Sequence, residues 1–277
     1  MLEGSAVQTV QGAPIFVPQP VGVPVGVGVG GGAVAAALPW GLSLFGGTNF
    51  EVDGDLIQEK DFSPNNLNTG QVFQPDTSYD DAFSEGWEVG AALERDLSPN
   101  TTIFGQGVYG EKSGGDFENG TFQQGFTDPN TGVFVPGTFD AQGNFFPGQT
   151  QVETITSEVS DLETITLEAG LRQYFGPPKS IRPYLAATAG AVYNDDVTIT
   201  NVSSGGTLTA EGNTFELIDS GWNPTASGLI GLETAVGTRG AIGVEGGIRW
   251  QDGVDTLFGG ADDRISLPLR LRGRVAF

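Results

Sequence analysis

The amino-acid sequence of 277 residues predicts an all-β fold of about eight antiparallel strands, and three observations support this prediction. Apolar residues alternate with polar or small residues along most of eight separate runs, which is the period of two expected of β-strands, although residues 101–110 alternate less cleanly and their faces are not assigned. Long and short connections between these runs follow one another in strict order. The last run ends the chain on an aromatic residue, Phe277.

The last run, residues 264–277, has one apolar face and one charged face. Every odd position from 265 to 277 is apolar or glycine, whereas the even positions include Arg270, Arg272 and Arg274. In a soluble protein the apolar face would pack on a core and the arginines would meet water. In a membrane barrel the apolar face meets lipid and the arginines point into the lumen. The terminal aromatic residue favours the membrane barrel.

The other runs give the order of connections. They lie at 40–47, 87–95, 101–110, 164–175, 181–193, 226–236 and 240–250. The short connections at 96–100, 176–180 and 237–239 contain the Gly, Pro and Asn residues of tight turns, and the long ones are 51–84, 113–160, 194–223 and 251–263. Membrane barrels have an even strand number, short periplasmic turns and long outer loops. The sequence therefore predicts an eight-stranded antiparallel up-and-down transmembrane β-barrel with long extracellular loops and short periplasmic turns, spanning residues 39–277.

Composition excludes several functions. The chain has 12 basic and 34 acidic residues, a net charge of −22, and neither histidine nor cysteine. A surface this acidic does not suit nucleic acid as a partner. Without cysteine or histidine the chain lacks thiol nucleophiles, the usual general base and the commonest zinc ligands. We therefore expect a protein that is not an enzyme and has no cofactor.

Residues 1–38 form a separate segment rich in Pro, Gly and Val. Prolines disfavour both helix and central strand, and the glycines favour a linker, so we expect a tail or linker. Ile15, Phe16 and Val17 leave open an extended segment that binds a protein partner. Residues 1–5 lack the features of a signal peptide, and we interpret them as an artificial remnant in place of a removed signal.

The polar faces of the predicted strands collect both signs of charge. If the apolar faces meet lipid, ten charged residues point inward: Glu88, Glu94, Glu168, Arg172, Glu233, Glu245, Arg249, Arg270, Arg272 and Arg274. Unpaired buried charges are costly, and an eight-stranded barrel is just wide enough for side chains to fill it. We therefore expect a structural network of ion pairs that closes the lumen, with a narrow conducting path as the alternative.

The long connections are acidic and almost free of Lys and Arg. Their clusters 51–55, 80–81, 194–196 and 262–263 offer carboxylates for calcium, although none has the spacing of an EF-hand loop. Solvated surface loops are the simpler expectation. Aromatic residues near the predicted strand ends are expected to form girdles at the membrane interfaces: Trp40, Trp87, Tyr174, Phe175, Tyr184, Trp250 and Phe277.

Residues 39–277 resemble the small outer-membrane β-barrel family of OmpA-like and porin-like proteins of Gram-negative bacteria. The resemblance rests on the Arg-Pro-Tyr-Leu strand start at 182–185, the Gly-Leu-Glu and Gly-Val-Glu-Gly-Gly-Ile-Arg strands and the alternating terminus. It implies a bacterial outer-membrane location with both termini periplasmic, and contact with outer-membrane lipid and lipopolysaccharide. A protein partner would bind the tail or the outer loops.

Three functional hypotheses follow from these features. The first is an integral outer-membrane barrel with a structural or surface-interaction role and a lumen closed by a Glu/Arg network. The second is a small pore or ligand conduit, and the third is a soluble β-barrel binding module.

Overall fold

The computed structural model describes residues 40–62, 70–128, 130–149, 152–177, 180–203, 214–256 and 259–277. The predicted tail, residues 1–38, lies outside these ranges, so its expected binding of a protein partner stays a prediction. The described residues are almost entirely β-strand, with one short helix, α1 (Tyr79–Ala82). No helix within these ranges is long and apolar enough to cross a membrane.

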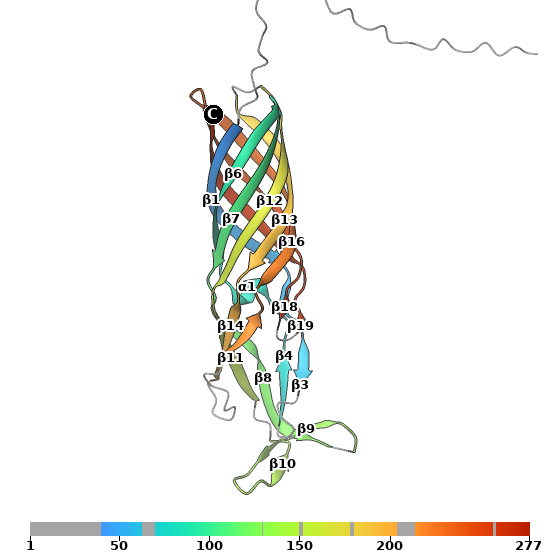
Figure 1. The fold of residues 1–277 in the computed structure, drawn as a ribbon. Coiled ribbons are helices and arrows are strands. Elements are labelled where there is room, and N and C mark those ends of the chain that lie inside the picture. Colours follow the sequence, from blue (N-terminus) through green and yellow to red (C-terminus); the bar gives the residue numbers. More distant parts are fainter. Residues whose placement is uncertain are drawn as a thin grey trace, which may run out of the picture. The chain divides into compact units, whose positions relative to one another are not determined.

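Eight strands close into an antiparallel barrel (Figure 1). In chain order they are β1 (Trp40–Asp53), β6 (Gly86–Ser98), β7 (Thr101–Lys112), β12 (Leu162–Tyr174), β13 (Arg182–Asn194), β16 (Gly221–Val236), β17 (Gly240–Gln251) and β20 (Arg264–Ala276). Each strand pairs with its neighbours in the chain, and β20 pairs with β1 to close the ring. The predicted eight-stranded up-and-down barrel is thus confirmed, including the pairing of the first and last runs.

The short connections all lie at one end of the barrel, which we call the short-turn end. Asn100, Gly237 and Phe175 lie in the three turns there, and Gly237 has a φ of 67°, a conformation that glycine adopts at low cost. The chain also ends here, where the amide of Phe277 donates a hydrogen bond to the carbonyl of Trp40 at 2.8 Å. The four long connections leave from the opposite end, which we call the long-connection end.

Short strands in the long connections extend beyond the long-connection end (Figure 1). We call the larger group the outer sheet; its strands are β3 (Lys60–Phe62), β4 (Gly70–Gln74), β8 (Asp116–Thr127), β9 (Phe134–Phe139), β10 (Phe145–Pro147), β11 (Val152–Val159), β14 (Val197–Ser203), β15 (Thr214–Ile218), β18 (Asp255–Thr256) and β19 (Gly259–Gly260). A separate pair, β2 (Asp55–Ile57) and β5 (Thr77–Ser78), leads into α1. The expectation of solvated loops was therefore wrong for much of these connections.

A buried apolar cluster explains why these connections fold. We call it the cap core, and it contains Leu56, Ile57, Tyr79, Ala82, Phe83, Phe117, Val159, Leu162, Val197, Ile199, Leu217, Ile218 and Val254. Its members come from all four long connections and from Leu162 at the start of barrel strand β12. These apolar residues occur singly or in adjacent pairs within largely polar segments, so no single connection shows a core pattern. Together they bury enough apolar surface to order the chain.

The outward face of the barrel is apolar on every strand. Large exposed apolar residues include Leu42, Leu44, Val89, Leu93, Ile103, Ile165, Leu167, Leu171, Leu185, Ile230, Leu232, Ile242, Val244, Ile248, Leu267, Leu269, Leu271 and Val275. Charged residues at outward positions occur only towards the two ends, as Arg95 at one and Glu111 and Glu163 at the other. The barrel wall therefore carries a continuous belt without charges.

Aromatic residues border this belt at both ends. Trp40, Phe175 and Phe277 are exposed at the short-turn end, and Trp87 and Trp222 at the long-connection end. Ring contacts tie the second group together, with Trp87 lying 5.4 Å from Tyr109 and Trp222 lying 5.5 Å from Tyr193.

Two of the seven predicted girdle residues were placed wrongly. Tyr174 and Tyr184 are only 2% and 0% exposed and point into the lumen, where their hydroxyls meet carboxylates. Both are at inward positions of their strands, so the alternation, rather than nearness to a strand end, decides their side.

Replacing Leu217 by alanine tests whether the cap core orders the long connections. Leu217 is fully buried, and a buried Leu→Ala change costs about 2–5 kcal/mol. We expect Leu217→Ala to speed limited proteolysis within residues 54–85, 113–161 and 195–220 in detergent-folded protein. Phe215→Ala, on the exposed side of the same strand, is the matched control. Equal cleavage rates of the two variants would contradict an ordered cap core.

Candidate functional site

All ten charged residues predicted to point inward lie inside the barrel. None of them is more than 9% exposed. The alternation of each strand places them there because successive side chains of a strand point to opposite faces. They come from five of the eight barrel strands, so their contacts cross the lumen as well as joining neighbours.

Glu94 is the centre of the group nearest the short-turn end. Its carboxylate is fully buried and meets three guanidinium groups, those of Arg172 at 3.0 Å, Arg274 at 2.9 Å and Arg272 at 2.5 Å. The hydroxyl of Ser43 donates a further hydrogen bond to it at 2.7 Å. Four strands therefore converge on one carboxylate: β1, β6, β12 and β20.

Glu233 forms the second carboxylate centre. It accepts hydrogen bonds from Arg182 at 3.0 Å, from Arg272 at 2.8 Å and from the hydroxyl of Tyr174 at 3.0 Å. The guanidinium of Arg182 also lies over the Tyr174 ring, 4.1 Å from its centre. Because Arg272 binds both Glu94 and Glu233, it bridges opposite sides of the lumen.

Glu245 is held by a tyrosine that reaches across an intervening strand. In the strand register Tyr184 pairs with Gly231, and Gly231 pairs with Glu245. The Tyr184 hydroxyl donates to Glu245 at 2.7 Å. A Cβ atom at Gly231 would stand only 2.2 Å from the tyrosine ring, so this glycine makes the contact possible. Arg270 and Arg172 lie 3.6 Å and 3.8 Å from the same carboxylate.

The middle of the lumen contains two more acidic residues. Glu88 pairs with Arg249 at 3.0 Å and with Arg270. Glu168 accepts hydrogen bonds from Gln106 at 2.5 Å and from Ser227 at 3.1 Å. Arg249 lies 4.0 Å from Glu168 and so connects the two carboxylates.

Further charged residues complete the lumen, and they were not among the ten residues predicted to point inward. Asp96 pairs with Arg274 at 2.7 Å, and Glu51 pairs with Lys112 at 2.5 Å and with Arg264 at 3.5 Å. These residues and Arg182 occupy inward positions near strand ends. The predicted runs 40–47, 87–95 and 101–110 stopped short of Glu51, Asp96 and Lys112. Arg182 and Arg264 lay within predicted runs, and the same alternation places them inward.

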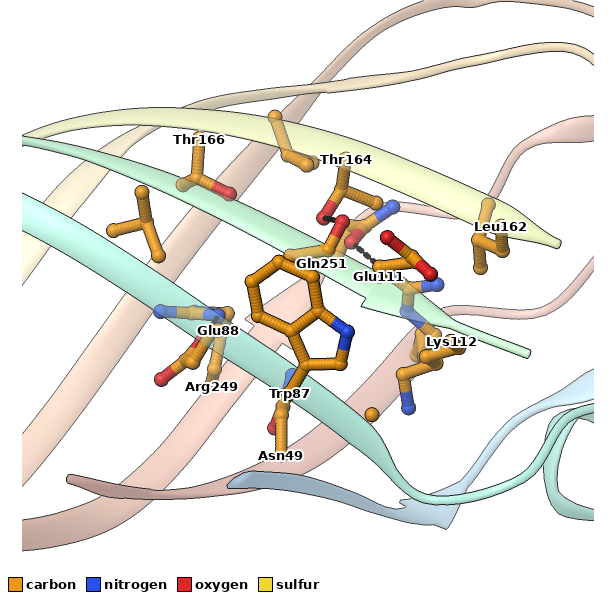
Figure 2. Close-up of a pocket in the computed structure, with 15 residues that line it drawn as sticks. Asn49, Trp87, Glu88, Glu111, Lys112, Leu162, Thr164, Thr166, Arg249 and Gln251 are labelled. Atoms are coloured by element: carbon orange, nitrogen blue, oxygen red, sulfur yellow. Dashed lines mark hydrogen bonds and ion pairs between the residues drawn. The ribbon is translucent and has the colours of Figure 1, made fainter. Parts of the chain in front are cut away.

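The long-connection end of the lumen is filled as well. Arg264 lies with its guanidinium 5.2 Å from the ring centre of Tyr79, a member of the cap core. Figure 2 shows the space below this end, lined among others by Asn49, Glu88 and Gln251. Its volume of about 20 Å³ is enough for roughly one water molecule. The cap core and the charged network thus leave little free space in this part of the barrel.

Eight of the chain's 12 basic residues are in the lumen: Lys112, Arg172, Arg182, Arg249, Arg264, Arg270, Arg272 and Arg274. Seven acidic residues face them: Glu51, Glu88, Glu94, Asp96, Glu168, Glu233 and Glu245. Near-equal numbers of opposite charges in contact offset the cost of taking each from water. Chemically, this arrangement fixes side chains in place and binds strands together.

The acidic clusters proposed for calcium have protein partners instead. Asp81 accepts a hydrogen bond from Ser78 at 2.7 Å, and Asp263 accepts one from the indole of Trp250 at 2.9 Å. Asp196 accepts one from the amide of Ser220 at 2.7 Å. Among the described residues, no group of three or more acidic side chains is arranged to hold a metal ion.

Comparisons with known proteins give structural likenesses only. No protein-family model matches the chain, and no curated protein is similar to it in sequence. Neisserial surface protein A (NspA) has 10% identity over 86% of this chain and 97% of its own, with a TM-score of 0.42. Ail, the attachment invasion locus protein of Yersinia pestis, solved with the heparin analogue sucrose octasulfate, has 9% identity over 86% and 99%, with a TM-score of 0.35. The COG4313 outer membrane channel from Pseudomonas putida F1 has 9% identity over 88% and 97%, with a TM-score of 0.23.

At such scores the likeness carries no conclusion about role. The fold class is established by the strand pairing of this chain itself, which closes an eight-stranded antiparallel barrel.

Arg272→Leu tests the lumen network. The change leaves Glu94 and Glu233 without a shared partner, and breaking a buried ion pair costs about 3–5 kcal/mol. We expect a loss of this order in the free energy of unfolding, measured by urea titration in detergent. Arg95→Leu removes an equal charge from an exposed outward position and should cost less than about 1 kcal/mol. Similar losses in both variants would argue against the network.

Gly231→Ala tests the reach of Tyr184 to Glu245. The new methyl group would overlap the tyrosine ring, and overpacking of this kind costs about 1–3 kcal/mol. Gly228→Ala is the matched control on the same strand, because a Cβ there meets no atom within 4 Å. Equal midpoints of urea unfolding for the two variants would contradict the close approach.

Proposed function

We propose that this chain is an integral protein of the bacterial outer membrane whose barrel serves as a closed anchor for a folded, acidic outer sheet. The role is structural or one of surface interaction, rather than transport. The observation that carries the proposal is the uncharged belt around the whole barrel, combined with a charged interior.

The belt has the dimensions of a lipid-facing surface. Ile165, which pairs with Tyr193, and Phe175, directly after β12, are ten positions apart along the chain. At a rise of about 3.3 Å per residue and a tilt of about 40°, this corresponds to a height of about 25 Å. Outer-membrane barrels carry an apolar band of about this height between aromatic girdles. A soluble barrel would expose this surface to water at great cost.

Orientation follows from the lengths of the connections. Outer-membrane barrels place short turns in the periplasm and long connections outside. The short-turn end, with Trp40 and Phe277, would then face the periplasm, and the outer sheet would lie at the cell surface.

A closed lumen argues against a pore. At the middle and short-turn levels the Glu and Arg side chains contact each other across the barrel, and at the other end the cap core covers the opening. A conducting path would require these ion pairs to separate within a medium that strengthens them.

The outer sheet presents an unusual surface for interaction. The four long connections, residues 54–85, 113–161, 195–220 and 252–263, contain 23 acidic residues and a single basic one, Lys60. Such a surface attracts cationic partners and repels anionic ones over about a Debye length. A surface-exposed partner of this protein is therefore expected to be basic.

Reconstitution into lipid vesicles tests the proposal. We expect the purified chain to enter vesicles, to resist extraction by carbonate and to migrate differently in detergent gels before and after heating. Planar bilayers containing the folded protein should show no stable single-channel openings, whereas a general porin in the same bilayers should.

Each outcome separates a different hypothesis. Recovery of folded protein in the aqueous phase without detergent would identify a soluble module. Stable openings, lost or altered in Arg272→Leu, would identify the lumen as a conduit and overturn the closed anchor.

A further inference from the structure

One part of the lipid-facing belt is hollow. A groove of about 600 Å³ lies over β16, β17 and β20 near the short-turn end. Its apolar walls are Ile181, Leu232, Ile242, Val244 and Leu271. This volume is within the range of sites that bind small ligands.

Gly273 creates the hollow. It occupies an outward position of β20 between Leu271 and Val275, where each neighbour projects a large side chain. A Cβ atom at Gly273 would meet nothing within 4 Å, so the space above it is open. Across the strand pair, Ile242 is its register partner. The floor of the groove is thus a glycine surrounded by branched aliphatic walls, which suits a flexible hydrocarbon chain.

A positive charge stands at the end of the same strands. Arg239 is in the β16–β17 turn, and its carbonyl accepts a hydrogen bond from the amide of Ala276 at 2.8 Å. It is three residues from Ile242, a distance of about 10 Å along an extended chain. Its side chain is exposed and has no ion pair with a described residue. Eight of the 12 basic residues lie in the lumen, so a free guanidinium at an exposed place is notable.

We propose that this groove and Arg239 bind one phospholipid, with an acyl chain over Gly273 and the phosphate on the guanidinium. The proposal rests on the proposed function, which places the short-turn end in the periplasmic leaflet. Charge complementarity selects the ligand, because a guanidinium binds phosphate through charge-assisted, paired hydrogen bonds. A second copy of the chain would fill the groove without needing Arg239.

Native mass spectrometry of the full chain tests this assignment. The protein is folded in detergent with either dioleoylphosphatidylglycerol or dioleoylglycerol, which lacks the phosphate. We expect one phosphatidylglycerol retained per wild-type barrel and at least a tenfold lower occupancy in Gly273→Phe. Gly228→Phe, at an outward glycine of β16 with equally open space, should retain the lipid.

The headgroup contact has its own variant. Arg239→Gln changes an exposed turn residue and should leave folding intact. It should lower retention of phosphatidylglycerol by about tenfold, the loss of one charge-assisted contact, and leave dioleoylglycerol unchanged.

Three results would overturn the proposal: equal retention by the two phenylalanine variants, unchanged phosphatidylglycerol retention in Arg239→Gln, or a dimer that Gly273→Phe abolishes. A barrel that enters vesicles but retains no lipid would refute this inference alone. A chain that does not enter vesicles would refute both it and the proposed function.

Discussion

The contact of Arg272 with Glu94 and Glu233 is the interaction on which the barrel depends most. It joins the last strand to β6, beyond β1, on one side and to β16, beyond β17, on the other, so it acts both where the barrel closes and through the interior. In water such a contact would contribute little, but inside the barrel each carboxylate would otherwise be buried without a counter-charge. The network therefore fixes the register of the strands as much as it stabilises them, because a slip of one residue would turn these charges towards lipid.

Alternation alone allowed the barrel and its ten principal charges to be predicted from the sequence. Odd and even positions of every strand point to opposite faces of the barrel, and this decides the side on which Glu88 or Arg270 lies. The order of connection lengths gives the topology. The same alternation would have placed Tyr174 and Tyr184 inside the barrel. They were instead predicted at the membrane interface because they lie near strand ends, and the structure shows that the alternation decides their side.

The alternation of apolar and polar residues could not predict the cap core. Leu56, Phe117, Val197 and Leu217 lie in four different connections, each of which reads as polar and acidic by itself. Their burial depends on the barrel holding the ends of these connections close together. A pattern that exists only between distant segments has no local period, so only the three-dimensional arrangement shows it. The contact of Tyr184 with Glu245 is similar, since it requires Gly231 on a third strand.

The placement of Arg270, Arg272 and Arg274 on the last strand also has a consequence for the order of folding. Until β20 joins the sheet, Glu88, Glu94 and Glu233 each lack at least one of their guanidinium partners. Closure of the ring and neutralisation of the interior are therefore a single event. A partly assembled barrel would keep an excess of negative charge on its inner face, where the carboxylates repel one another, and this makes intermediates unfavourable. The chain should thus complete its barrel in one cooperative step, with its C-terminal strand as the last and obligatory component.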